Sequence, residues 1–119
     1  MKKQIKKNEE LKKLIEELKK ASISSKVNIW KRIATDLEKP SRRRRVVNLY
    51  KIEKNARSDE TIVVPGKVLG TGDLNKKLTI AAYNFSEDAF AKINQKGTAI
   101  SIMELIQKNP QGKKVRILG

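Results

Sequence analysis

Apolar residues in the first third of the chain recur with the spacing of an α-helix, in two separate stripes. The two stripes are Leu11, Leu14, Ile15, Leu18 and Val27, Trp30, Ile33, Ala34, Leu37. The first predicts a helix beginning at Asn8, and the second predicts a helix ending before Pro40. Because a helical apolar stripe is usually buried, both are expected to face a core. Trp30 is more simply an anchor of that core than a platform for base stacking.

The later part of the chain alternates between strand-like and helix-like segments. A short helix is expected after Asn48, and β-branched residues 61–64 predict a strand that ends in a turn at Pro65-Gly66. Further strands are predicted at residues 78–83, 98–100 and 115–118. Ser86 and Ser101 are expected to cap the intervening helices, which end near Gly97 and Pro110.

This order predicts an α/β fold: a basic helical N-terminal part followed by a compact α/β layer with a small, partly parallel sheet. Residues 1–7 would be a basic tail, 8–57 a helical, arginine-rich RNA-binding part, and 58–119 the α/β part. With 119 residues, the parts together are expected to form a single domain. Dense like charge predicts that the tail does not fold before RNA arrives.

Charge separates the two halves. The chain has 28 Lys and Arg against 13 Asp and Glu, a net charge of +15, and residues 1–57 carry +12 of it. Such an excess favours non-specific binding to nucleic acid or to anionic membranes. A membrane-surface protein would need exposed Phe, Trp and Leu opposite the charges, and the chain has too few to spare from the core. No apolar run approaches the ~20 residues that span a bilayer, so a soluble intracellular protein is expected.

Four consecutive arginines, Arg42, Arg43, Arg44 and Arg45, form the densest charge in the chain. Four guanidiniums in a row cannot all be buried, so this run must face water or a polyanion. Guanidinium binds phosphate oxygens through two parallel hydrogen bonds, which makes phosphate the expected partner.

Catalysis has little support in the sequence. The chain contains neither Cys nor His, which removes the commonest nucleophile–base pairs and metal ligands. Gly66, Gly70 and Gly72 fit neither the P-loop nor a dinucleotide-binding fingerprint. They are interpreted either as loop glycines with positive φ or as bare backbone that lies, with Lys67, Lys76 and Lys77, against a sugar-phosphate chain. No enzymatic activity, cofactor or small-molecule substrate is expected.

The other basic residues differ in how many acidic residues lie near them in the sequence. Lysines of the first helix alternate with glutamates, as on an ordinary wet face, whereas Lys26, Lys31 and Arg32 have few acidic neighbours. No helix-turn-helix, zinc-finger, basic-zipper or RNA-recognition-motif signature is present. Charge spread over a tail, helices and loops favours a large folded RNA, which is read through its shape, phosphates and 2′-hydroxyls.

Several motifs, weak individually but specific in this order, resemble the archaeal and eukaryotic large-subunit ribosomal protein family L-eighteen-e, in the superfamily of bacterial L-fifteen. They are Ile29-Trp30, the segments 40–49, 63–72 and 77–82, Phe85-Ser86, Glu104-Leu105 and the segment 109–112. The resemblance implies a non-enzymatic structural component of the large ribosomal subunit, with a compact α/β domain bound to the major rRNA. It also implies neighbouring ribosomal proteins and a cytoplasmic location on the ribosome.

Residues expected to neutralise rRNA phosphates are Lys26, Lys31, Arg32, Arg42, Arg43, Arg44, Arg45, Lys67, Lys76, Lys77, Lys113, Lys114 and Arg116. Two alternatives remain at this stage. One is an architectural or regulatory nucleic-acid-binding protein that works off the ribosome, and the other is a basic protein-interaction adaptor.

Overall fold

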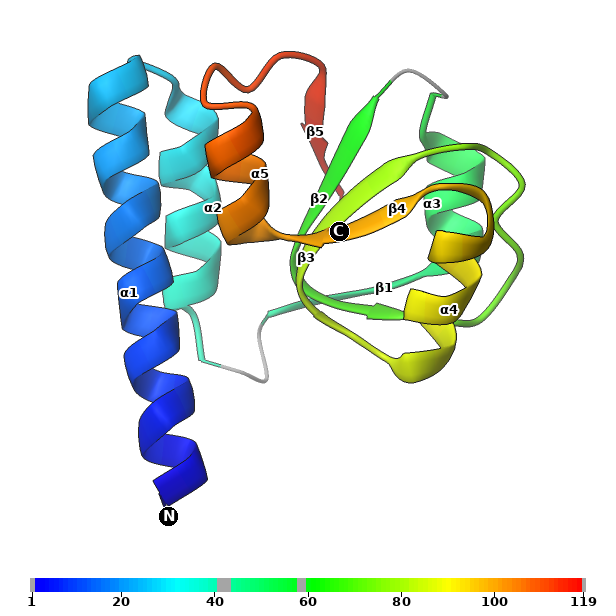
Figure 1. Cartoon of the computed structure of the whole chain (residues 1–119), viewed down its shortest axis with the longest axis horizontal. Helices are drawn as coiled ribbons and strands as arrows, with labels where there is room; N and C mark the ends of the chain where they lie inside the picture. The colour runs from blue at the N-terminus through cyan, green and yellow to red at the C-terminus, as the bar shows by residue number, and fades with distance from the viewer. Residues whose placement is uncertain (1, 41–43, 58–59, 119) are drawn as a thin grey trace.

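A five-stranded parallel sheet with helices on both faces organises the chain in the computed structural model, which describes residues 2–40, 44–57 and 60–118 (Figure 1). In chain order the elements are α1 (Lys2–Ser25), α2 (Asn28–Glu38), β1 (Arg45–Asn48), α3 (Leu49–Asn55), β2 (Thr61–Leu69), β3 (Thr79–Phe85), α4 (Glu87–Lys96), β4 (Thr98–Ser101), α5 (Ile102–Lys108) and β5 (Val115–Ile117). The predicted α/β class is confirmed, and the predicted helices and strands occur in the predicted order, with β1 as an additional strand and every pairing parallel.

Strand β2 holds the sheet together. The strands run β1-β2-β3-β4, and β5 also pairs with β2. β5 lies beside the first half of β2, where Thr61 pairs with Val115, while β1 lies beside the second half, where Asn48 pairs with Leu69. One long strand thus joins two short ones that are far apart in the sequence.

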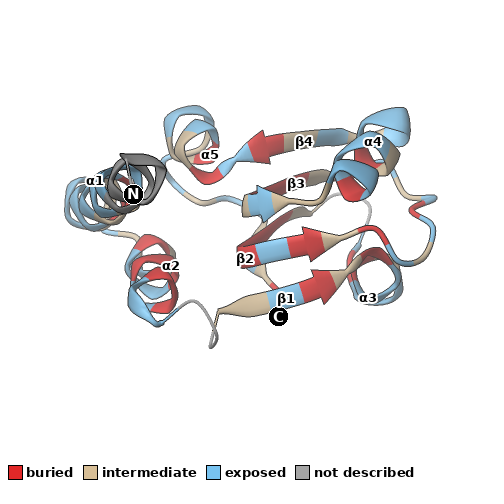
Figure 2. Cartoon of the chain, turned by 90° about the horizontal axis from the view of Figure 1, so that it is seen from below, coloured by how far each residue is buried: buried red, intermediate tan, exposed pale blue. Residues whose placement is uncertain are grey.

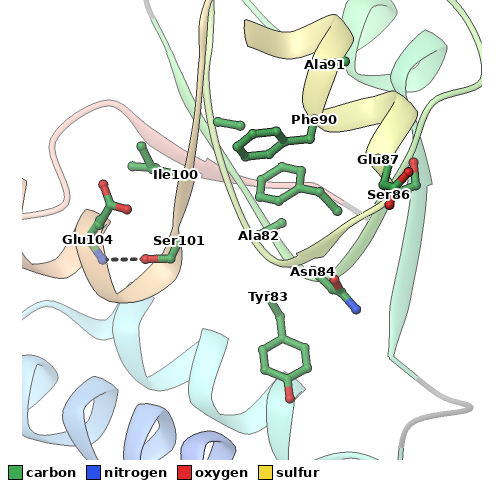
Figure 3. Close-up of a pocket in the computed structure, with 12 residues that line it drawn as sticks. Ala82, Tyr83, Asn84, Ser86, Glu87, Phe90, Ala91, Ile100, Ser101 and Glu104 are labelled. Atoms are coloured by element: carbon green, nitrogen blue, oxygen red, sulfur yellow. Dashed lines mark hydrogen bonds between the residues drawn. The ribbon is translucent and has the colours of Figure 1, made fainter. Parts of the chain in front are cut away.

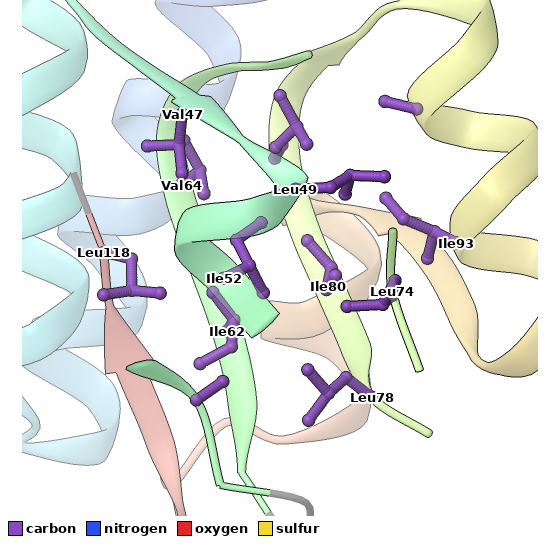
Figure 4. Close-up of a cluster of buried hydrophobic side chains, with 14 residues drawn as sticks. Val47, Leu49, Ile52, Ile62, Val64, Leu74, Leu78, Ile80, Ile93 and Leu118 are labelled. Atoms are coloured by element: carbon purple, nitrogen blue, oxygen red, sulfur yellow. The ribbon is translucent and has the colours of Figure 1, made fainter. Parts of the chain in front are cut away.

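The alternating side chains of the sheet build two cores, one on each face. α1, α2 and α5 cover one face and α3 and α4 cover the other (Figure 2). In β2, Ile62 and Val64 join the cluster under α3 and α4 (Figure 4), whereas Val63 joins the cluster under α1, α2 and α5. A sheet covered on both faces explains why its strands read as nearly continuous apolar runs. Val47 and Ile52, from the predicted helical part of the chain, pack in the first cluster with the strands.

Trp30 anchors the second core, as predicted. Its side chain is fully buried, and its indole Nε1–H donates a hydrogen bond to the carbonyl oxygen of Pro110 at 2.8 Å. A buried Trp needs a partner for this N–H. This bond therefore ties α2 to the loop that follows α5.

Several predicted helix ends are confirmed. Ser86 and Ser101 lie at the N-caps of α4 and α5, and each hydroxyl accepts a backbone N–H three residues on, at 3.1 Å. Asn48 is the N-cap of α3, although its side chain makes no capping hydrogen bond. α1 begins at Lys2, earlier than the predicted start at Asn8.

The predicted turn at Pro65-Gly66 is wrong, because β2 continues through both residues to Leu69. Proline provides no N–H for a ladder. Here the pairing of β2 with β3 shifts register between Val64 and Lys67, so the missing donor falls within an irregularity of the ladder. Beyond the shift, β2 pairs with β1, a strand that the sequence pattern did not predict.

Replacing Gly66 by alanine is expected to lower the free energy of unfolding by about 1–3 kcal/mol, the usual cost of overpacking. A Cβ at this position would lie 1.9 Å from the backbone oxygen of Arg45, so the two strands would have to separate. Urea unfolding measures the change. Gly112→Ala is not a suitable control, because the φ of Gly112 is +65° and alanine would be strained there. The control is Ala91→Gly, at an exposed position of α4, which should lower the free energy of unfolding by about 1 kcal/mol.

Candidate nucleic-acid interface

Basic residues predicted to contact phosphate form three groups in the structure. The β1 group is Arg44, Arg45 and Lys67; the α2 group is Lys26, Lys31 and Arg32; the amino-edge group is Lys77, Lys113, Lys114 and Arg116. Arg42 and Arg43 lie outside the described residues. The remaining candidate, Lys76, belongs to none of the three groups.

The β1 group lies where the second half of β2 meets β1. Val46 of β1 pairs with Lys67 of β2, which in turn pairs with Asn84 of β3. Paired residues of neighbouring strands point to the same face, and all three are exposed. Lys67 therefore stands in an exposed row across three strands, beside the start of β1.

Arg45 is fixed by a carboxylate that sequence reasoning missed. Its Nη2 and Nε lie 3.1 Å and 3.3 Å from Oδ2 of Asp36, and Lys39 Nζ lies 3.0 Å from Oδ1 of the same carboxylate. Asp36 is buried on α2. A carboxylate on the apolar stripe of a helix was the signal available in the sequence, because such a group is rarely buried without a partner. This contact joins α2 to β1 and fixes the side chain of Arg45.

Arg44 lies against an aromatic ring. Its guanidinium carbon is 5.5 Å from the ring centroid of Tyr83 on β3, a cation–π distance. Stacking on one face leaves the edge of a guanidinium able to donate hydrogen bonds. Two arginines of the run are thus held by neighbouring elements.

The α2 group is exposed and lies near the loop between α5 and β5. Lys26 follows α1 in a left-handed conformation with φ of 56°, and Lys31 and Arg32 occupy the first half of α2. A Cβ on Gly112 would lie 3.1–3.9 Å from side-chain atoms of residues 27, 29 and 30. The loop therefore packs on the start of α2, and both lie at the top of Figure 1.

The amino-edge group gathers where strands of the sheet begin. Thr61 of β2 pairs with both Val115 and Thr79, which brings the residues just before β5 and β3 to one edge. Lys77, Lys113 and Lys114 are exposed there. Arg116, on β5, lies 3.5 Å from the carboxylate of Glu60 and donates to the backbone oxygen of Asn55 at 2.9 Å.

Lys76 makes its contacts inside the protein. Its ammonium donates to the backbone oxygens of Glu53 and Ala56 at 2.6 Å and 2.7 Å, at the end of α3. These carbonyls are the ones that a helix end leaves without intrahelical partners, and a cation there interacts favourably with the helix dipole. The geometry therefore gives Lys76 a structural role.

The glycine-rich loop is also held by internal contacts. Lys92 of α4 donates to the backbone oxygens of Gly70 and Gly72 at 2.8 Å and 3.1 Å. Gly72 has φ of +99°, and a Cβ there would lie 2.6 Å from that of Tyr50. The interpretation as loop glycines with positive φ is correct for Gly72 and wrong for Gly66, which lies in β2, and for Gly70, whose φ is not positive. The contact of this loop with RNA stays a prediction.

The described part of the chain has no group of acidic side chains placed to hold a metal ion. Across the same residues, no helix is long and apolar enough to cross a membrane. The surface carries basic side chains on several helices, strands and loops, and the sheet and its helices hold these side chains at fixed positions. Such an arrangement suits contact with the phosphates of a large nucleic acid.

Comparison with known proteins decides the family. The model of the family that comprises the ribosomal proteins 50S-L15, 50S-L18e and 60S L-twenty-seven-A matches residues 8–101. The chain belongs to this family of ribosomal proteins. The resemblance noted in the sequence is thereby confirmed, and with it the expectation of a ribosomal protein rather than an enzyme.

Relatives of the L15/L18e family extend the likeness over nearly the whole chain. "Large ribosomal subunit protein eL18" of Haloarcula marismortui is 49% identical over 93% of this chain and 96% of its own length. The protein of the same name from Methanosphaerula palustris is 48% identical over 93% of both chains. That of Archaeoglobus fulgidus is 43% identical over 95% of this chain and 97% of its own. The L15/L18e likeness thus covers more of the chain than the residues that the family model matches.

Proposed function

We propose that this chain is a structural component of the large ribosomal subunit, where it binds and bridges rRNA through the β1, α2 and amino-edge groups. The observation that carries the proposal is the near-full-length likeness, in both directions, to proteins named for the large ribosomal subunit. Neighbouring ribosomal proteins are its other partners, and its place is the cytoplasmic ribosome.

Arrangement of the basic groups supports a bridging role. Residues before β5 and β3 lie at one edge of the sheet, whereas the β1 group lies beside the opposite end of β2. Arg45 pairs with Gly66, and Lys67 is the next residue of β2, so the β1 group lies about six residues from Thr61, which is roughly 20 Å at 3.3 Å per residue. Phosphates at both ends would therefore belong to different RNA segments. Arg42 and Arg43 extend the β1 group in this proposal.

Two adjacent lysines are expected to respond differently to replacement by alanine. Lys76→Ala should lower the free energy of unfolding by about 1–3 kcal/mol, because it leaves two carbonyls at the end of α3 without their donor. Lys77→Ala should change stability by less than about 0.5 kcal/mol, since that side chain is exposed. It should instead reduce the salt slope of RNA binding by about 1. Urea unfolding and binding to purified large-subunit rRNA measure the two effects. Equal effects of the two variants on RNA binding would contradict the structural role of Lys76.

Sedimentation of cell extract through a sucrose gradient tests the proposed function itself. The chain is expected to migrate with large ribosomal subunits, also in moderately high salt. A light fraction would favour the alternative, an architectural or regulatory nucleic-acid-binding protein that works off the ribosome. Complexes that survive nuclease treatment would instead indicate a protein-interaction adaptor.

A further inference from the structure

An open groove of about 570 Å³ lies at the carboxyl ends of β3 and β4, between α4 and α5. Figure 3 shows the side chains around it, with Phe90 and Ala91 on α4, and Ser101 and Glu104 at the start of α5. None of the basic groups described above contributes a residue to this groove.

The topology of the sheet opens this groove. The helix after β3, α4, packs on one face of the sheet, and the helix after β4, α5, packs on the other. Two adjacent parallel strands whose connections leave in opposite directions form a switch point, where a crevice opens outside their carboxyl ends. Ligands of open α/β sheets preferentially bind at such crevices. The groove thus has a cause in the fold and is no accident of side-chain packing.

Its walls are apolar. Phe85 and Phe90 meet edge to face, with ring centroids 5.9 Å apart. Phe90 remains 49% exposed, one of the few large apolar side chains at the surface of the described residues. Ala82, Ala91 and Ala99 are small and leave room beside the two rings. An exposed aromatic pair of this kind fits an apolar side chain of a partner.

Its charge is opposite to that of the chain as a whole. The lining residues carry two carboxylates, Glu87 and Glu104, and include no lysine or arginine, although the chain has a net charge of +15. Outside the lining, Lys92 of α4 lies 3.6 Å from the carboxylate of Asp88 and donates to the glycine-rich loop, and Lys108 of α5 lies 3.9 Å from the carboxylate of Glu104. Arg44 of the β1 group stacks on Tyr83 at one edge of the groove, but beside Glu87 an RNA phosphate would be repelled, whereas a cationic segment would be attracted.

A partner is not expected to bind here by pairing a strand of its own with the edge of β4. β4 has four residues and forms the edge of the described sheet. Asn94 Oδ1 accepts the N–H of Ala99 at 2.9 Å, which occupies a donor that an added strand would need. An occupant is therefore held by its side chains in the groove and not by a new ladder.

We infer that this groove holds a segment of a neighbouring protein, rich in lysine or arginine, that inserts an apolar side chain beside Phe90. The inference rests on the proposed function, since the neighbours are those that the large subunit would supply. Glu87 is the main carboxylate that attracts the cations of the segment, since Glu104 is already paired with Lys108. The two phenylalanines receive its apolar side chain. Binding there gives the chain a protein contact on a surface that rRNA avoids.

Photocrosslinking from the groove tests the inference. p-Benzoylphenylalanine replaces Ala91, which is exposed and lines the groove, or, as a control, Gln107, which is exposed on α5 outside it. The cells are irradiated, and crosslinks are mapped by mass spectrometry in whichever gradient fraction holds the chain. The Ala91 probe is expected to reach a Lys- or Arg-rich segment of one other protein, and the Gln107 probe is expected not to reach that segment.

A charge-reversed variant tests whether the crosslink from position 91 depends on the negative charge of the groove. Glu87→Lys should reduce the yield of the Ala91 crosslink about tenfold or more, because like charges would then meet. Glu87→Gln should reduce it less, and Glu10→Lys, a reversal at an exposed position on α1, should leave it unchanged. Crosslinks to rRNA, to a second copy of this chain, or to nothing would overturn the inference. A chain that fails to migrate with large subunits would overturn the proposed function, and the crosslinks from its own fraction would still show what the groove binds.

Discussion

Replacing Trp30 by alanine is expected to lower the free energy of unfolding by about 3–5 kcal/mol, the range for truncating a buried aromatic side chain. The side chain is fully buried and lies in the cluster shared by α1, α2, α5 and the sheet. Its removal leaves a cavity and also cuts the hydrogen bond to Pro110. Because domains of this size are stable by only about 5–15 kcal/mol, the loss is a large fraction of the whole. Urea unfolding followed by circular dichroism measures it.

Phenylalanine at the same position separates the two contributions. Trp30→Phe keeps an aromatic ring in the core but removes the indole N–H, so a smaller loss of about 1–2 kcal/mol is expected. A loss below about 1 kcal/mol for the alanine variant would contradict the anchoring role, since it lies outside the range for buried aromatic truncation.

Binding of the chain to purified large-subunit rRNA should weaken steeply with salt. If six to ten phosphate contacts form, raising salt from about 50 to about 200 mM should reduce the affinity by ~10³–10⁵ through counterion release. Each of the three basic groups contains exposed lysines or arginines, so six to ten phosphate contacts can form. Filter binding or fluorescence anisotropy over this range gives the slope of log affinity against log salt.

Single substitutions show which residues contribute to that slope. Lys67→Ala and Lys113→Ala, both at exposed positions, should each lower it by about 1. Glu10→Lys, which adds a cation outside the three groups, should not lower it. Association that is insensitive to salt would refute the phosphate-binding hypothesis, whatever the chain's place in the cell.

Helices and caps were the predictable part of the fold, because their signals are local. The apolar stripe around Trp30 predicted both a helix and a buried anchor, and Ser86 and Ser101 identified the helix starts through short-range hydrogen bonds. The capping hydrogen bonds join residues that are three apart in the sequence, and the burial of Trp30 follows from the helical spacing of the apolar residues around it.

Strand β1 and the passage of β2 through Pro65-Gly66 were not predictable in this way. Proline and glycine usually end a strand. Here the backbone of Arg45 approaches Gly66 closely, and a neighbouring strand from an earlier part of the chain decides the outcome. Partners of this kind are invisible in a local pattern, because tertiary context overrides local propensity.

Charge identified the candidate site only as a set of cations. Lys76 and Lys77 are indistinguishable in sequence, yet one binds carbonyls at the end of α3 while the other is exposed. Asp36, on the apolar stripe of its helix, could be suspected of burial from the sequence, but its partners Arg45 and Lys39 could not be identified there. Only the folded arrangement separates basic side chains that complete the protein from those left for a partner.

The hydrogen bond between Trp30 and Pro110 spans 80 residues of sequence, and this has a consequence for the order of events during synthesis. At about 5–20 residues per second, the indole is made some 4–16 s before its acceptor exists. β5, which completes the edge of β2, is made later still. During this interval Trp30 lacks both its hydrogen-bond acceptor and the strands and α5 that complete its core. Long-range pairing also slows folding, so protection by a chaperone would matter most in this interval.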